Sequence, residues 1–303
     1  MKLIFEQLII LYAFILLGML FGKVKKGLSD HTGLLSFLLV NLFLPAKVFN
    51  SFSENFTLPY IKSNYLILCV SLVFLLVFVV MSLLLSKLFA KNPDQKGVYR
   101  YNFTISNYGY MGYVLAEELL GDLGLTSMIL FCIPFAMYTY TFGYMLLTGS
   151  KLSVKKLLNT ITVSIVLGCA VGLSGITLPN ALSTVISSAS ACAGPLAMLL
   201  AGIVLSDFSL KELFGDKTSY IVCAVRLVGI PLAVFGVCLL FSLEFVFPYV
   251  MLMTSMPCGL NPIIFPKLVG KDCRLGARLA FLSHLFACVT LPVWLYLILL
   301  QWH

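Results

Sequence analysis

The stretch NYGYMGYVL, from Asn107 to Leu115, lies inside an apolar run where a membrane-spanning helix is expected. It begins with an asparagine, holds two glycines and is preceded by a second asparagine, Asn102. Glycine weakens a helix, and a polar group in hydrocarbon needs an internal hydrogen-bond partner. The stretch therefore does not suit a regular helix facing lipid, and its explanation has to come from the rest of the chain.

The composition around this stretch is that of a membrane protein. Hydrophobic residues make up 60% of the 303 residues, charged residues only 11%, and the mean hydropathy is +1.03. Soluble domains carry about 25% charged residues. Apolar runs of roughly 20 residues recur along the chain, which is the length a helix needs to cross about 30 Å of hydrocarbon. We therefore predict an all-α polytopic membrane protein.

Charged or turn-rich breaks divide the apolar runs into ten expected spans. These spans cover residues 3–22, 33–52, 64–89, 101–120, 126–148, 158–177, 183–205, 219–241, 245–265 and 276–300. The lysines and arginines flank the connections after odd-numbered spans, with the exceptions of Lys2, Lys47, Lys62 and Arg226. The positive-inside rule then places both termini outside the cell membrane. This placement accounts for the net charge of +8 without a nucleic-acid partner.

Residues that punctuate helices recur at a single spacing of 150 residues. The pairs are Gly18 and Gly168, Gly22 and Gly172, Pro45 and Pro195, Thr104 and Thr254, and Gly109 and Gly259. We therefore divide the chain into a first five-helix repeat over residues 1–150 and a second over residues 151–303. Five is odd, so the second repeat enters from the opposite face, as in the inverted repeats of secondary transporters. The four glycines of the first and sixth spans suit close helix packing.

At the same spacing, NYGYMGYVL corresponds to PCGLNPIIF, Pro257 to Phe265. A broken helix frees backbone groups that are tolerated only where they line a cavity, and the positive ends of half-helices attract anions. We therefore predict that the fourth and ninth spans are broken, that glycine permits each break, and that the breaks form an anion site. We also expect proline in the first turn of a half-helix that follows a break, because its missing amide would be unpaired there. The candidate binding residues are Asn102, Asn107, Gly109, Gly112, Pro257, Gly259, Asn261, Pro262, Lys47 and Arg226.

Few ionisable residues lie inside the spans. Lys47 either serves the site or extends to the membrane interface, and a buried Arg226 is a functional candidate by default. His284 is either a satisfied core histidine or part of the site. The acidic residues Glu117, Glu118 and Asp122 fit a solvated helix end. Metal-site, nucleotide-binding and hydrolase motifs are absent, so neither an enzyme nor a cofactor is indicated.

Four motifs, in order, resemble the auxin efflux carrier family in its bacterial branch of organic-acid permeases of the malate and malonate type. They are NYGYMGYVL, GPLAMLLAG (Gly194 to Gly202), VRLVGIP (Val225 to Pro231), and SMPCGLNPIIF followed by SHLFACVTLPVW. The chain departs from the family pattern at Ser106, where arginine is frequent, and at Val114, where proline is frequent.

This resemblance implies ten helices in two inverted repeats, with the fourth and ninth helices crossing at their breaks. It also implies outward termini, a homodimer, and elevator-like movement of a transport domain against a scaffold. Substrates in the family are organic anions such as auxin, malate and malonate. By resemblance, Asn107, Gly109, Pro257, Gly259 and Asn261 fall at the crossing.

The expected function is uniport-like efflux of a small organic anion. One net charge moving across the membrane is worth about 2.3 kcal/mol per 100 mV, so an inside-negative potential favours anion exit. Two alternatives within transport are a cation-coupled symporter of the bile-acid type and a drug or metabolite exporter. Outside transport, the alternative is a membrane enzyme or a sensor.

Overall fold

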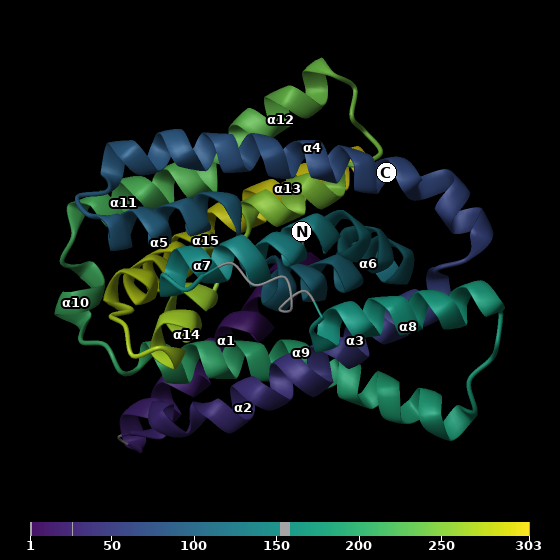
Figure 1. Cartoon of the computed structure of the whole chain (residues 1–303), viewed down its shortest axis with the longest axis horizontal. Helices are drawn as coiled ribbons and strands as arrows, with labels where there is room; N and C mark the ends of the chain where they lie inside the picture. The colour runs from purple at the N-terminus through teal and green to yellow at the C-terminus, as the bar shows by residue number, and fades with distance from the viewer. Residues whose placement is uncertain (1, 26, 152–157, 303) are drawn as a thin grey trace.

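The computed structural model describes residues 2–25, 27–151 and 158–302, and the regular secondary structure in them is entirely helical, without a β-strand (Figure 1). The predicted start of the second repeat lies partly outside the described residues. The α-helices of the N-terminal half are α1 (Lys2–Val24), α2 (Thr32–Leu38), α3 (Leu44–Asn55), α4 (Leu58–Phe89), α5 (Pro93–Thr104), α6 (Tyr113–Tyr138) and α7 (Tyr144–Thr148). Those of the C-terminal half are α8 (Thr160–Ser174), α9 (Asn180–Leu205), α10 (Leu210–Phe214), α11 (Lys217–Ala224), α12 (Ile230–Leu240), α13 (Phe247–Ser255), α14 (Asn261–Leu268) and α15 (Arg274–Trp302).

Short turns of other helix types join several of these elements. A 3-10 turn precedes α2, three π-helical turns continue one α-helix into the next, and a fourth leads into α6 after a non-helical segment. The turns are η1 (Leu28–His31), η2 (Leu39–Phe43), η3 (Tyr108–Gly112), η4 (Thr139–Gly143) and η6 (Val225–Gly229). π-helical turns inside α-helices are frequent at functional sites.

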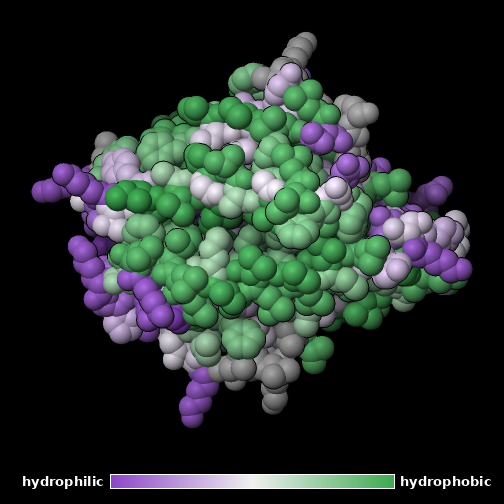
Figure 2. All heavy atoms as spheres, turned by 90° about the horizontal axis from the view of Figure 1, so that it is seen from above, coloured by the Kyte–Doolittle hydropathy of each residue, from purple (hydrophilic) through white to green (hydrophobic). Residues whose placement is uncertain are grey.

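Six described segments are long and apolar enough to cross a membrane. They are Thr32–Asn55, Leu58–Phe89, Pro93–Thr148, Asn180–Leu205, Lys217–Leu240 and Arg274–Gln301. Two shorter apolar helices, Leu8–Val24 and Thr160–Ser174, accompany them. Figure 2 shows a face covered by hydrophobic residues, with hydrophilic residues gathered toward its left and right margins. The chain is therefore a multi-pass membrane protein.

One group of helices consists of α1, α2, η2, α3, α8 and α9, which pack against one another. In Figure 1, α2, α3, α8 and α9 lie along the lower side of the molecule. A Cβ atom added to Gly18 of α1 would lie 2.1 Å from the carbonyl oxygen of Leu199, and one added to Gly168 of α8 would lie 2.8 Å from the Cβ of Phe52. The predicted role of these glycines in close helix packing is thus confirmed.

The remaining helices form a second group. In it α4 packs on α5 and α6, α13 packs on α12 and α15, and α14 packs on α7 and α15. Contacts between the two groups run mainly through α3 with α6, α9 with η3, and α1 with α15. The molecule therefore has two bodies of packed helices with a defined boundary between them.

Two helices are interrupted inside the second group. The first ends at Thr104, passes through an extended Ile105 (φ −116°, ψ 135°) and resumes at Tyr108. The second ends at Ser255, has an extended Met256 (φ −66°, ψ 147°) and resumes at Asn261. Both interruptions lie within the expected fourth and ninth spans.

The expectation that glycine permits the first break is wrong. Gly109 and Gly112 both lie within the π-helical turn η3, which follows the interruption, and Gly112 has helical dihedral angles (φ −64°, ψ −40°). A positive φ occurs instead at Gly121 (φ 74°), which kinks α6 close to the expected boundary between the fourth and fifth spans. The prediction for proline is confirmed at Pro262, which lies in the first turn of α14.

Candidate functional site

The two interruptions contact each other through their backbones. The amide of Asn107 donates to the carbonyl oxygen of Pro257 at 2.8 Å, and the hydroxyl of Ser106 donates to the carbonyl oxygen of Met253 at 2.6 Å. The amide of Cys258 donates to the hydroxyl of Ser283 in α15 at 2.9 Å. Backbone groups freed at helix ends must find partners when they are buried. Here Ser106 and Asn107 supply donors to carbonyl oxygens at the second interruption, and Ser283 of α15 accepts from the amide of Cys258.

Arg226 caps the helix that leads into the second interruption. Its guanidinium Nη1 donates to the carbonyl oxygen of Thr254, in the last turn of α13, at 2.7 Å. The side chain is 1% exposed, and no carboxylate in the described part of the chain lies within 4 Å of it. A cation at a helix C-terminus interacts favourably with the helix dipole. The structure therefore gives Arg226 a bond to the backbone beside the interruption and does not place it in the pocket described next.

A small pocket, with a cavity volume of about 50 Å³, lies where the two helix groups meet. Leu44 and Val48 of α3 and Ile161 of α8 line it from the first group. The second group contributes both interruptions, through residues 105–110 and 259–261, together with residues of α6 and η4. Ligand sites in proteins occur preferentially at such boundaries between packed bodies.

Four of the ten candidate residues line this pocket: Asn107, Gly109, Gly259 and Asn261. A Cβ atom added to Gly109 would have no neighbouring atom within 4 Å, so the surroundings of Gly109 are open. Gly259 lies against the first interruption, since a Cβ there would be 3.4 Å from the carbonyl oxygen of Ser106. The pocket lining does not include Asn102, Gly112, Pro257, Pro262, Lys47 or Arg226.

The amide of Asn107 is held by His284. The Nδ2 atom of Asn107 lies 3.2 Å from Nε2 of His284, and Nδ1 of His284 lies 2.7 Å from the carbonyl oxygen of Ala280. Asn107 is 1% exposed and His284 is 3% exposed. The Oδ1 atom of Asn107 is buried and has no hydrogen-bond partner. A buried acceptor without a partner lowers stability, and its presence indicates that Oδ1 of Asn107 is available for a hydrogen bond to a ligand.

The two other asparagines differ in their surroundings. Nδ2 of Asn261 donates to the hydroxyl of Tyr101 at 2.7 Å, a bond that joins α14 to α5 at the edge of the pocket. Nδ2 of Asn102 donates to the carbonyl oxygen of Val98 in its own helix at 2.9 Å, and its Oδ1 is buried without a partner. Asn261 therefore belongs to the pocket wall, whereas Asn102 is turned back along α5.

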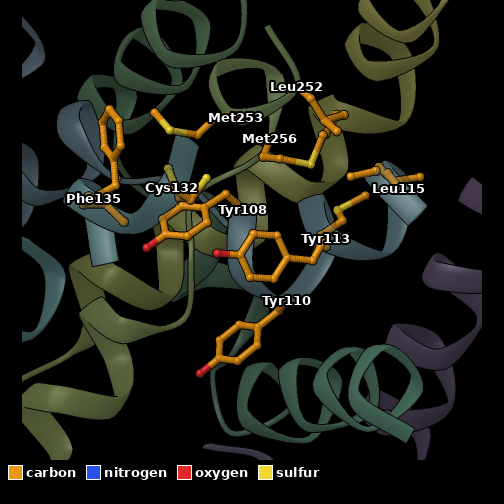
Figure 3. Packing of buried hydrophobic residues seen from close by; sticks show 14 of the residues in the cluster. Tyr108, Tyr110, Tyr113, Leu115, Cys132, Phe135, Leu252, Met253 and Met256 are labelled. Carbon is orange, nitrogen blue, oxygen red and sulfur yellow. The ribbon is translucent and has the colours of Figure 1, made fainter. Parts of the chain in front are cut away.

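Three tyrosines of the opening stretch line the pocket and were not among the candidate residues. They are Tyr108, Tyr110 and Tyr113. The rings of Tyr108 and Tyr113 lie edge to face, with centroids 5.8 Å apart, and Figure 3 shows Tyr110 directed away from this pair. Their presence in NYGYMGYVL could have marked them as candidates. A tyrosine has an apolar ring and a polar hydroxyl, so it suits a site that is partly apolar and partly polar.

Lys47 belongs to an ion pair outside the pocket. Its Nζ atom lies 2.5 Å from Oε2 of Glu117, joining α3 of the first group to α6 of the second. Lys47 is 3% exposed and the Glu117 side chain is 34% exposed. One expectation is thereby corrected: Glu117 is the counter-ion of a buried lysine rather than part of a fully solvated helix end.

Comparison with known proteins identifies the family of the chain. The model of the family described as "Membrane transport protein" matches residues 3–156 and 145–295. An uncharacterized transporter of Methanocaldococcus jannaschii is 24% identical over 292 residues, which cover 92% of this chain and 93% of the relative. The family matches cover most of the sequence, including both interruptions and the pocket. The chain therefore belongs to the membrane transport protein family.

Proposed function

We propose that the chain is a secondary transporter that exports small organic anions, such as dicarboxylates or auxin-like acids, through the pocket at the two interruptions. The observation that carries the proposal is the composition of the pocket wall. Both interruptions contribute to it, and the opposite wall comes from α3 and α8 of the other helix group. A site between two bodies can open to either side of the membrane when one body moves against the other.

The proposed architecture is ten spans in two inverted five-helix repeats, over residues 1–150 and 151–303, with the fourth and ninth spans crossing at their interruptions. The bond from Asn107 to Pro257 supports it, because these residues are separated by the same 150 positions as the paired glycines. The family matches, over residues 3–156 and 145–295, also meet near the proposed boundary.

Alternating access would use the two helix groups as scaffold and transport domain. In this proposal α1, α2, α3, α8 and α9 form the scaffold, and the helices that carry the interruptions move against it. The boundary is lined at the pocket by apolar scaffold residues, among them Leu44, Val48 and Ile161. Away from the pocket, hydrogen bonds join Ser51 to Thr126 and Tyr12 to the backbone oxygen of His284 across the same boundary. The ion pair between Lys47 and Glu117 also spans this boundary. It would have to break, or the two side chains would have to follow the movement, during the cycle.

The chemistry of the pocket favours an organic anion. The first amides of a helix have no partner within the helix. The start of η3, at Tyr108, Gly109 and Tyr110, and the start of α14, at Asn261, line the pocket. These two helix starts carry partial positive charge. Asn107, Asn261 and the three tyrosines add hydrogen-bonding groups, and the described lining contains no carboxylate that would repel an anion.

Export of one net negative charge per cycle is favoured by about 2.3 kcal/mol for every 100 mV of inside-negative potential. We therefore propose efflux driven by the membrane potential. Following the family resemblance, we also propose a homodimer in the cell membrane with both termini on the extracytoplasmic side, and a place in the organic-acid permease branch.

Proteoliposomes loaded with labelled malate or malonate test this function. An inside-negative potential should accelerate exit of the label from liposomes that contain the wild-type protein. With the Asn107→Ala variant, exit should fall to the level of loaded liposomes without protein. The matched control is Asn64→Ala, since Asn64 donates to Tyr60 within its own helix and is not part of the pocket lining. Exit that requires sodium, or that ignores the potential, would count against the proposal.

A further inference from the structure

The neutral form of His284 fixes the orientation of the Asn107 amide. The carbonyl oxygen of Ala280 can only accept a hydrogen bond, so the hydrogen of the neutral ring lies on Nδ1, 2.7 Å away. Nε2 is then an acceptor, and it receives a hydrogen from Nδ2 of Asn107 at 3.2 Å. This arrangement leaves Oδ1 of Asn107, an acceptor, as the buried group without a partner.

Protonation of His284 would reverse this orientation. Both ring nitrogens of an imidazolium are donors, so Nε2 then requires an acceptor and conflicts with the Nδ2 group. Rotation of the Asn107 amide by half a turn brings Oδ1 to Nε2 and restores the bond. The Nδ2 group takes the place of Oδ1 and offers two N–H donors that have no protein partner. A proton at His284 thus changes the free end of Asn107 from acceptor to donor.

We propose that His284 is a positioning residue that couples carboxylate binding at Asn107 to the uptake of one proton. This inference rests on the proposed function, because it assumes that the pocket lined by Asn107 binds an organic anion. A carboxylate can only accept hydrogen bonds, so it is repelled by a free Oδ1 and held by a free Nδ2 group. The empty pocket favours neutral His284, and the occupied pocket favours the protonated form.

The surroundings of His284 supply no competing counter-ion. No carboxylate in the described ranges lies within 4 Å of its ring. Tyr12 of α1 and Cys288 of α15 both hydrogen-bond to the backbone oxygen of His284, at 2.9 Å and 3.6 Å, and not to the ring. Titratable or charged side chains on the elements packed against α15 include Tyr12 of α1, Tyr101 of α5, Cys223 of α11, Arg226 of η6 and Tyr249 of α13, and Cys258 and Cys288 lie close to His284 along the chain fold. The carboxylates on these elements are Glu6, Asp94 and Glu212. A bound carboxylate would therefore be the anionic partner of the imidazolium.

The charge balance agrees with export driven by the membrane potential. A dicarboxylate carries two negative charges, and the proton on His284 offsets one of them. The loaded site then holds one net negative charge, which is the charge that an inside-negative potential moves outward. If the proton leaves with the substrate, each cycle exports a dicarboxylate together with one proton.

The pH dependence follows from reciprocal coupling of the two binding events. Because proton and carboxylate each favour the binding of the other, anion affinity is highest where His284 is protonated. Affinity then falls by up to about tenfold per pH unit as the free protein loses this proton while the complex retains it. Carboxyl groups ionise near pH 4, so the charge of a simple dicarboxylate changes little above pH 6.

Calorimetric titration of the purified full-length protein with malate tests the coupling. The heat is measured at pH 7 in two buffers of different ionisation enthalpy, which gives the number of protons taken up per malate bound. The wild-type protein should take up about one proton, and its affinity should fall by up to about a hundredfold between pH 6 and pH 8. His284→Gln keeps a hydrogen-bonding amide that cannot titrate, so it should take up none and bind malate equally at both pH values. The control is His31→Gln, at an exposed position at the end of η1, which should behave as wild type.

The outcomes separate the inference from the proposed function. Malate binding by the wild-type protein without proton uptake overturns the coupling and leaves the transport proposal standing. Proton uptake that persists in His284→Gln also overturns it. Failure of the wild-type protein to bind malate, malonate or succinate at any pH overturns both proposals. The number of protons that the wild-type protein takes up per malate tests the coupling even if His284→Gln does not fold.

Discussion

The backbone amide of Asn107 donates to the carbonyl oxygen of Pro257 at 2.8 Å, and these residues are 150 positions apart in the sequence. A hydrogen bond between two interrupted helices fixes their separation and brings the side chain of Asn107 to the pocket wall. The same pair of segments is linked by the bond from Ser106 to Met253. The site thus depends on contacts between distant parts of the chain, and substitutions can separate binding from folding.

The first prediction concerns Asn107 and Asn261. We expect Asn107→Ala and Asn261→Ala each to reduce transport at least about tenfold, since loss of a hydrogen bond to a charged ligand costs about 1.5–3 kcal/mol. Folding should survive, because the side chains of Asn107 and Asn261 are held by single hydrogen bonds, to His284 and to Tyr101 respectively. Transport in proteoliposomes and thermal unfolding of the purified variants measure the two effects. Normal transport by both variants would show that the pocket is not the substrate site.

The second prediction concerns the ion pair between Lys47 and Glu117, which links the two helix groups. Glu117→Gln leaves a buried ammonium without its counter-ion, and we expect a loss of about 2 kcal/mol of stability. This is below the 3–5 kcal/mol typical of fully buried pairs, because Glu117 is one-third exposed. The double variant Lys47→Met with Glu117→Gln should recover part of the loss.

A double-mutant cycle of thermal unfolding measures the energy of this pair. Because Lys47 is not among the pocket-lining residues, malate affinity of the double variant should stay within about twofold of wild type. Additive effects of the two single substitutions would show that the pair is not coupled. A large loss of affinity in a folded double variant would restore Lys47 as a binding residue.

Several features of the structure could be predicted from the sequence alone. The apolar runs predicted helices because a helix in lipid satisfies its own backbone, and Pro262 marked a first turn because proline lacks the amide that would be unpaired there. The 150-residue spacing brought Asn107 and Asn261 into one hypothesis, and both line the pocket.

Partners that lie far apart in the chain could not be predicted. Glu117 is 70 residues from Lys47, and Tyr101 is 160 residues from Asn261. The first break falls at Ile105 rather than at the glycines because Ser106 and Asn107 bond to the carbonyl oxygens of Met253 and Pro257. Local helix propensity holds no information on such bonds, so the break was expected at the residues that are weakest in isolation.

The third prediction concerns the contact between α1 and α9. A Cβ added to Gly202 would lie 2.0 Å from the carbonyl oxygen of Ile15, and backbone atoms cannot move aside as flexible side chains do. We expect Gly202→Ala to destabilise the protein by about 3 kcal/mol, at the upper end of the range for overpacking. Gly236→Ala in α12, where no atom lies within 4 Å of the added methyl group, is the matched control.

Thermal unfolding of these glycine variants in the same detergent tests the packing. Gly236→Ala should be neutral or slightly stabilising, because alanine favours a helix over glycine by about 1 kcal/mol. Equal melting temperatures for both variants would contradict the close approach of α1 and α9.

The fourth prediction concerns Gly109, which lines the pocket and has open space around it. An alanine fits there without a clash, so Gly109→Ala should fold as well as wild type. Gly109→Leu places a branched side chain in the space that the substrate would fill, and we expect at least about a tenfold loss of malate affinity with little change in stability, because a buried leucine-sized group displaces ligand contacts worth about 1.5–3 kcal/mol. Gly236→Leu, also in open space but not part of the pocket lining, controls for the size of the substitution. Malate binding by Gly109→Leu with wild-type affinity would place the substrate elsewhere, whereas loss of binding in Gly109→Leu alone would locate it at the start of η3.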